Sequence, residues 1–173
     1  VVMKKSNRVE EFRVGNYVVS AKSGSLGKVV STCGGLGENG VVIEIGDILT
    51  GGYTSFVKDE DIRPIPLTEG LLEDVLSDVF QKAECDYKYR PTEYEIPREV
   101  FPGVFGTANW SLIEDDEERG KWWLSAGTGS LLTVVKSLHH IQNLFYDLEG
   151  EKLAVYEYQV NRYLKKQESR ERE

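Results

Sequence analysis

Two stretches decide the fold of this chain: IRPIPLT at residues 62–68 and LHHIQNLF at residues 138–145. The first ends a region of short apolar segments and opens a helix, while the second lies inside a helix of its own. Each follows a group of strand-like segments, so strands and helices come in separate groups along the chain. This arrangement predicts an α+β protein.

The helix that follows residue 67 has a capped start and one apolar face. Thr68 is a suitable N-cap, and Glu69 places negative charge in the first turn. Leu67 and Leu72 have the spacing of a hydrophobic staple. Apolar residues then recur at helical spacing, namely Leu71, Leu72, Val75, Leu76, Val79 and Phe80. We therefore expect a connecting helix over residues 68–83.

Before this helix, the chain has the pattern of five short strands. Phe12, Val14 and Val18 fall on one face of the first strand. The other four are expected at residues 27–30, 41–45, 53–58 and 62–65. Five short strands separated by turns are typical of a small barrel, which closes most of its own edges. We expect an SH3-like β-barrel lobe over residues 9–67.

The segment after the helix is rich in proline and aromatic residues. Residues 84–108 contain three prolines, and proline at this density breaks regular structure. We expect an irregular arm here, with one short strand near Tyr94. Loops of this length are often functional.

Beyond the arm, three strand segments and a helix predict a second lobe over residues 109–153. The strands at 109–113, 121–125 and 131–136 are separated by turns, so they should form a three-stranded antiparallel meander. The helix that starts at Leu138 is expected to end before Gly150. Residues 154–173 are expected to form a C-terminal helix or tail, frayed from Lys165 onward, with a helix favoured over a strand.

Composition restricts the class of partner. The chain has 173 residues and a net charge of −8, which argues against nonspecific binding to duplex nucleic acid. Its two cysteines, Cys33 and Cys85, lack metal-binding spacing and indicate reduced thiols. We see no signal peptide and no apolar run long enough to span a bilayer. These features predict a cytoplasmic protein without a membrane partner.

Several motifs resemble catalytic or binding signatures but lack the neighbouring elements or residues that such sites need. GLGENG at 35–40 has the letters of a dinucleotide fingerprint, but a strand follows it instead of a helix. The acidic run at 114–118 lacks the alternating ligands and central glycine of a calcium loop. Neither cysteine has a histidine nearby in the sequence, and there is no nucleophile elbow. We predict no cofactor, no metal and no catalytic residue.

The two histidines, His139 and His140, are adjacent on the second helix, so they point in different directions and are poorly placed to chelate one ion. His139 shares a helix face with Gln142, Asn143 and Tyr146. This face has three possible interpretations: a polar contact surface, a solvated face, or a set of hydrogen bonds buried against the barrel.

The chain resembles a family of short proteins found in gut bacteria of the Bacteroides group and in their phages and mobile elements. The resemblance rests on RVGNYV at 13–18, IRPIPLTE at 62–69, WWL at 122–124, and the segments HHIQNLF at 139–145 and LEGEKL at 148–153. The 84–108 arm and the C-terminal tail are longer here than in that family. The resemblance implies a phage or mobile-element setting, and no activity, ligand or catalytic residue.

The leading hypothesis is a non-enzymatic interaction or adaptor protein that binds a protein partner. Trp122 and Trp123 must face opposite sides of their strand, so one should be core and the other exposed. Exposed aromatic residues often anchor protein partners. The predicted partner-binding residues come from the arm, the meander and the second helix: Tyr87, Tyr89, Tyr94, Phe101, Trp123, His139, Gln142 and Tyr146.

Two alternatives remain. Small barrels often bind nucleic acid, and Lys22, Lys28 and Arg63 would then be the contacting cations. The chain could also be an enzyme with an unfamiliar site around His139 or His140.

Overall fold

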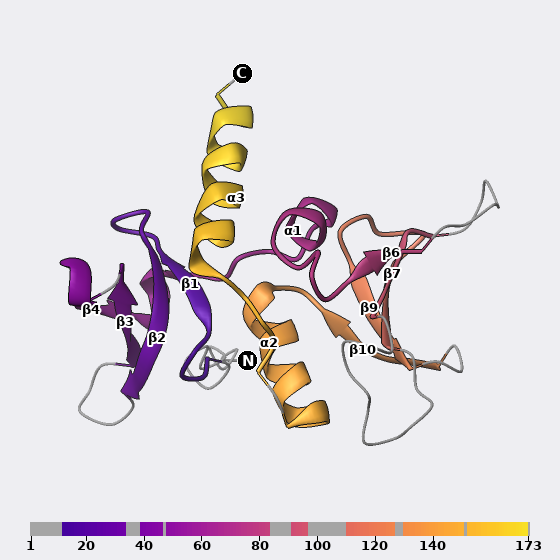
Figure 1. The fold of residues 1–173 in the computed structure, drawn as a ribbon, viewed down its shortest axis with the longest axis horizontal. Helices are drawn as coiled ribbons and strands as arrows, with labels where there is room; N and C mark the ends of the chain where they lie inside the picture. The colour runs from indigo at the N-terminus through magenta and orange to yellow at the C-terminus, as the bar shows by residue number, and fades with distance from the viewer. Residues whose placement is uncertain are drawn as a thin grey trace, which may run out of the picture. The chain divides into compact units, whose positions relative to one another are not determined.

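The computed structural model describes residues 12–33, 39–46, 48–83, 91–96, 110–126, 130–150 and 152–172. Within them the chain forms ten strands, in two antiparallel five-stranded sheets, and three α-helices (Figure 1). The predicted α+β class is confirmed. The chain divides into two compact units: the first comprises Val1–Pro66 and Ser137–Leu144, and the second comprises Leu67–Lys136 and Phe145–Glu173.

Five short strands form the sheet of the first unit, as the sequence predicts. They are β1 (Tyr17–Ser20), β2 (Leu26–Cys33), β3 (Gly40–Ile45), β4 (Tyr53–Lys58) and β5 (Ile62–Arg63). The short 3-10 helices η2 (Ile48–Thr50) and η3 (Asp59–Asp61) flank β4. The strand order is β4-β3-β2-β1-β5, and the sheet curls into a half-barrel (Figure 1).

The inner side of this sheet holds the core of the first unit. Gly27 in β2 leaves space for the core residue Ile43, because a Cβ at position 27 would lie only 2.6 Å from Cδ1 of Ile43. The core residues are Phe12, Val18, Val29, Val41, Ile43, Val57 and Ile62.

The prediction that Val14 shares the inner face with Phe12 and Val18 is wrong, because its side chain is 60% exposed. The chain turns before β1, where Gly15 has a positive φ of 98° and the Arg13 amide donates to Oδ1 of Asn16 at 2.8 Å.

The sheet of the second unit contains the predicted meander and two further strands. Its strands are β6 (Gln81–Lys82), β7 (Glu93–Glu95), β8 (Trp110–Glu114), β9 (Trp122–Ala126) and β10 (Ser130–Val135), in the order β10-β9-β8-β7-β6. The short strand expected near Tyr94 is β7. Tyr94, Leu112 and Leu124 lie opposite one another across β7, β8 and β9. All three are buried, so this row runs through the core of the unit.

The first helix is shorter than predicted. Thr68 caps α1 (Glu69–Asp74), and its Oγ1 accepts a hydrogen bond from the Leu71 amide at 3.1 Å, as the sequence indicated. The expectation of a helix to residue 83 is wrong, because residues 75–80 form turns before β6. The sequence at this point, DVLSDV at 74–79, is rich in residues of low helix propensity. Burial still follows the predicted apolar positions, so Leu76, Val79 and Phe80 remain in the core.

The other two helices lie where the sequence places them. They are α2 (Leu138–Glu149) and α3 (Glu157–Arg170). The preference for a helix near the C-terminus is confirmed, but α3 continues through the residues expected to fray from Lys165 onward. The first half of α2 belongs to the first unit and the second half to the second unit, whereas we expected the whole helix to belong to the meander lobe.

In the second unit, the rings of Phe80 and Phe145 meet edge to face at 5.8 Å. Helices α1 and α3 lie side by side (Figure 1). The hydroxyls of Thr68 and Tyr163 are 2.7 Å apart, and Lys166 Nζ lies 2.8 Å from Oδ2 of Asp74. The N-cap of α1 therefore also holds α3.

Across the described part of the chain, no helix is both long enough and apolar enough to cross a membrane.

We expect Leu76→Asp to destabilise the second unit by roughly 3 kcal/mol or more, because it places a charge at a fully buried position. Urea unfolding followed by circular dichroism would measure the loss. The matched control is Asp78→Ala, two residues away on the exposed side, which should change the free energy of unfolding little. Equal stability of the two variants would contradict the placement of Leu76 in the core.

Candidate functional site

The polar face of α2 meets the turn that precedes β1, within the first unit. Positions 139, 142 and 143 lie on one side of a helix, as i, i+3 and i+4. Their side chains contact residues 12–17, and these contacts decide between the three interpretations of that face.

His139 is a buried, neutral histidine. Its side chain is 6% exposed, and its ring lies 4.5 Å from the ring of Phe12. Its Nδ1 lies 2.9 Å from the hydroxyl of Ser137, which is also buried. Burial, with a smaller contribution from the neighbouring His140, lowers the pKa of His139 to about 4. The imidazole is therefore uncharged at neutral pH.

Gln142 and Asn143 use their amides to hold the turn. Oε1 of Gln142 accepts from the Tyr17 amide at 3.3 Å, and its Nε2 donates to the Gly15 carbonyl at 3.4 Å. Nδ2 of Asn16 donates to Oδ1 of Asn143 at 3.0 Å. His139 and Gln142, predicted as partner contacts, therefore belong to a set of hydrogen bonds directed into the first unit. Tyr146, in the second unit, remains half exposed, as a contact residue would be.

A second polar cluster, which the sequence analysis did not predict, surrounds Tyr94 in the second unit. The Tyr94 hydroxyl donates to Oε1 of Glu73 at 2.9 Å and lies 3.5 Å from Oε1 of Glu69. Lys82 forms an ion pair with Glu69 and lies 3.6 Å from Glu73. Glu69 and Glu73 are one helical turn apart, so the sequence alone indicates that their side chains lie close together. Lys82 and Tyr94 join them only because β6 and β7 pair at these residues.

The burial of Tyr94 corrects its predicted role. Its side chain is 1% exposed, and its ring packs edge to face against Trp122 at 5.7 Å. Burial, followed by the hydrogen bond to Glu73 and its charge, raises the pKa of the Tyr94 phenol far above its usual value. Tyr94 is a protonated core donor, so it does not offer a partner the surface contact that we predicted.

Trp123 lies on the opposite side of β9 from Trp122, as predicted. Trp122 is fully buried, whereas Trp123 is partly exposed. Trp123 Nε1 donates to Oδ2 of Asp115 at 2.9 Å, and Lys121 Nζ lies 5.4 Å from the centre of the Trp123 ring. The Trp123 hydrogen bond, followed by that from the Glu117 amide, lowers the pKa of Asp115 to about 2. The acidic run therefore forms a hydrogen-bonded hairpin turn.

The three cations proposed for nucleic-acid binding lie in the first unit but form no concentrated positive surface. Lys22 pairs with Asp61 at 2.7 Å. Lys28 lies 5.9 Å from the centre of the Tyr17 ring and faces Glu44 across the β2–β3 pair. Arg63 is exposed on β5.

Tyr87, Tyr89 and Phe101 of the predicted arm lie outside the described residues, as does Cys85. Among the described residues, no group of three or more His, Cys, Asp or Glu side chains could hold a metal ion. A hollow in the second unit is lined only by apolar atoms of Trp110, Leu124, Phe145 and Leu148, and it encloses no room for a water molecule.

The clearest surface feature is one that the sequence analysis did not single out. Strand β10 lies at the edge of its sheet, and it exposes Leu131 and Leu132 by 52% and 50%. In the first unit, edge strand β4 exposes Tyr53 and Phe56. The sequence shows that these strands contain apolar residues. Their place at the edge of a sheet depends on the pairing of segments that are far apart in the sequence.

No protein-family model matches the chain, and comparisons with curated proteins and with solved structures gave no match.

The buried His139 predicts a pH dependence of stability. Because its pKa is about 4 when folded and about 6.5 when unfolded, the unfolded state binds the extra proton between these values. The contribution to stability is complete above pH 6.5 and declines as the pH falls toward 4. We expect a loss on the order of 2 kcal/mol from pH 7 to 4.5, measured by urea unfolding.

The variant His139→Gln should be less stable at pH 7 and should lose most of this slope, while His140→Gln should keep it. A pKa near 6.5 for His139 by NMR titration of the folded protein, with its signal assigned by comparison with His140→Gln, would contradict the neutral buried state, as would an unchanged slope in His139→Gln.

Proposed function

We propose that this protein is a non-enzymatic adaptor that binds a protein partner through the edge of the second sheet. In keeping with the family that the sequence resembles, it would be encoded by a phage or mobile element and would act in the bacterial cytoplasm. The observation that carries the proposal is the exposed apolar edge formed by β10.

Exposed strand edges are usually protected in natural proteins, by devices that include charged side chains and proline. Strand β10, with the sequence SLLTVV, has neither. The pairing of β10 with β9 shifts register between Leu131 and Thr133, and both leucines at this irregularity are exposed. An uncharged edge with two exposed leucines is costly to leave in water, and a partner that covers it would remove that cost.

The geometry fits recognition by strand addition. An extended segment of the partner would bond to the outer backbone groups of β10, while its apolar side chains would pack on Leu131 and Leu132. Trp123 lies opposite Val134 on the neighbouring strand and is partly exposed. In this proposal Tyr146 and the arm residues Tyr87, Tyr89 and Phe101 supply further contacts.

The first unit would serve as the scaffold, as an SH3-like barrel. Its strand order and the short 3-10 helix η3 before β5 support this assignment. The enzyme alternative has weaker support, because His139 is buried against Phe12 and Ser137.

The proposal predicts that edge variants lose the partner. Tagged protein would be incubated with lysate of the host, with and without nuclease, and captured proteins would be quantified by mass spectrometry. We expect one protein in near-stoichiometric amount with the wild type, and at least a tenfold reduction with Leu131→Glu plus Leu132→Glu. Removal of residues 86–104 should also reduce capture.

The control is Val14→Glu, which introduces one glutamate at an exposed apolar position of the first unit. It should capture as much partner as the wild type. Unchanged capture by the folded edge variant would show that β10 is not the binding surface, and loss of the captured protein with nuclease would show that nucleic acid carries the interaction.

A further inference from the structure

Helix α3 is amphipathic, and its exposed side has an unusual composition. Val160 and Tyr163 face the second unit and are buried. The opposite side contains Tyr158, Arg162 and Lys165, which are spaced by about one turn and are all exposed. An aromatic ring and two cations therefore form one continuous stripe along the helix.

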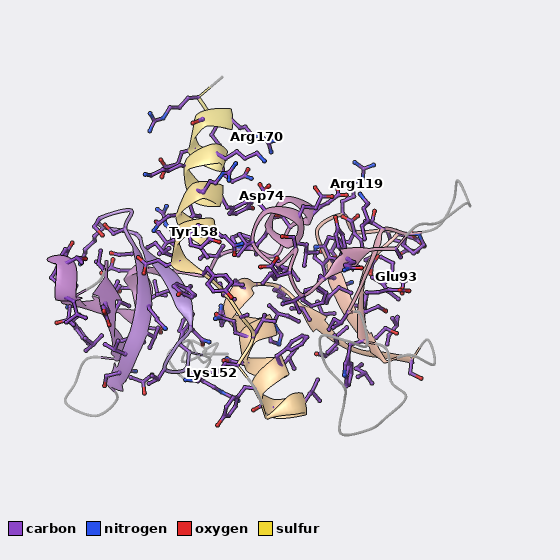
Figure 2. All side chains as sticks on the ribbon, viewed as in Figure 1. Asp74, Glu93, Arg119, Lys152, Tyr158 and Arg170 are labelled. Atoms are coloured by element: carbon purple, nitrogen blue, oxygen red, sulfur yellow. The ribbon has the colours of Figure 1, made fainter. Side chains whose placement is uncertain are left out.

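A second tyrosine enlarges the aromatic end of the stripe. Tyr156 precedes α3, and its ring lies 5.9 Å from the ring of Tyr158 at an interplanar angle of 32°. The two side chains are 49% and 68% exposed. Figure 2 labels Tyr158 near the first turn of α3 and Arg170 near its last. The paired rings lie at the start of the helix, and the cations follow them along its length.

The charge of α3 is opposite to that of the whole chain. The helix has four basic and two acidic residues, whereas the chain has 21 and 29. Lys166 is occupied by Asp74. Among the residues that the structure describes, no ion pair joins Arg162, Lys165 or Arg170 to an acidic side chain. Within the described part of the chain, acidic side chains therefore do not neutralise the positive charge of this face.

We propose that this face of α3 binds single-stranded nucleic acid. Bases would stack on Tyr156 and Tyr158, and phosphates would contact Arg162 and Lys165. Stacking on aromatic rings beside a line of cations is the way that proteins bind single strands without reading sequence. An acidic protein segment would satisfy the cations but would leave the paired tyrosine rings without a matching partner. This activity goes beyond the adaptor function and uses a different element of the second unit.

The rest of the chain is acidic, which limits the affinity for nucleic acid. The affinity must also fall as the salt concentration rises, because contacts to phosphates release counterions. Each phosphate neutralised on a single strand contributes a slope of about −0.7 to log K against log salt. With contacts from Arg162 and Lys165, the slope is about −1.4. Raising the salt fourfold should therefore weaken binding about sevenfold.

The test is fluorescence anisotropy of a labelled oligothymidylate of about 16 nucleotides, titrated with the full chain. We expect Arg162→Glu plus Lys165→Glu to weaken binding at least tenfold, and Tyr158→Ala to weaken it at least fivefold. Tyr158→Phe should retain it, because stacking needs only the ring. Thermal melting would verify that each variant is folded, since all three positions lie away from the buried side of α3.

The matched control is Lys28→Glu plus Arg63→Glu, which makes the same charge change on exposed positions of the first unit. It should bind as the wild type does. The proposal is wrong if the oligonucleotide does not bind at low salt, or if only the control variant loses binding. It is also wrong if polyglutamate competes as well as unlabelled oligonucleotide and Tyr158→Ala has no effect, because this face would then suit an acidic protein.

Discussion

The rest of the structure depends on the pairing of two short segments, residues 65–67 and 136–138. The Leu138 amide donates to the Ile65 carbonyl at 2.9 Å, and the Leu67 amide donates to the Lys136 carbonyl at 3.0 Å. Pro66, which has no amide hydrogen to donate, faces Ser137 between these bonds. Glu69 and Leu138 then begin α1 and α2, so this one pairing lies directly before both helices. Ile65, Leu67 and Leu138 are almost fully buried, which protects the bonds from water.

Most of the titratable and amide side chains that were candidates for a functional site instead stabilise the fold. His139, Gln142 and Asn143 join the polar face of α2 to the turn before β1, and Tyr94 joins β7 to α1 through Glu73. A buried polar group is stable only when it has a hydrogen-bond partner, so these residues come in complementary pairs. The shifted pKa values of His139 and Tyr94 follow mainly from that burial. Perturbed pKa values mark functional sites in many enzymes, but structural networks perturb them as well.

Two of the features left over after this structural use lie on the surface of the second unit. One is the uncharged edge of β10 with its exposed leucines, and the other is the aromatic and basic side of α3. They differ in chemistry, since the first offers backbone groups and apolar area while the second offers rings and positive charge. If both proposed surfaces are used, the chain would bring a protein and a nucleic-acid strand together.

The sequence by itself determined the class of each main element and where most of them begin. Hydrophobic periodicity and capping are local effects, so neighbouring residues are enough to predict them. They indicated the helical spacing after Thr68, the cap itself, the five short strands and the helix before Gly150. Only the tertiary structure decided which polar side chains are buried and which strand lies at an edge. Asn16 and Asn143 are 127 positions apart in the sequence, and Lys82 meets Tyr94 only through strand pairing. No local pattern encodes such contacts, since they depend on how separate segments pack. For the same reason the sequence suggested His139 and Tyr94 as partner contacts, while their burial became visible only in the folded chain.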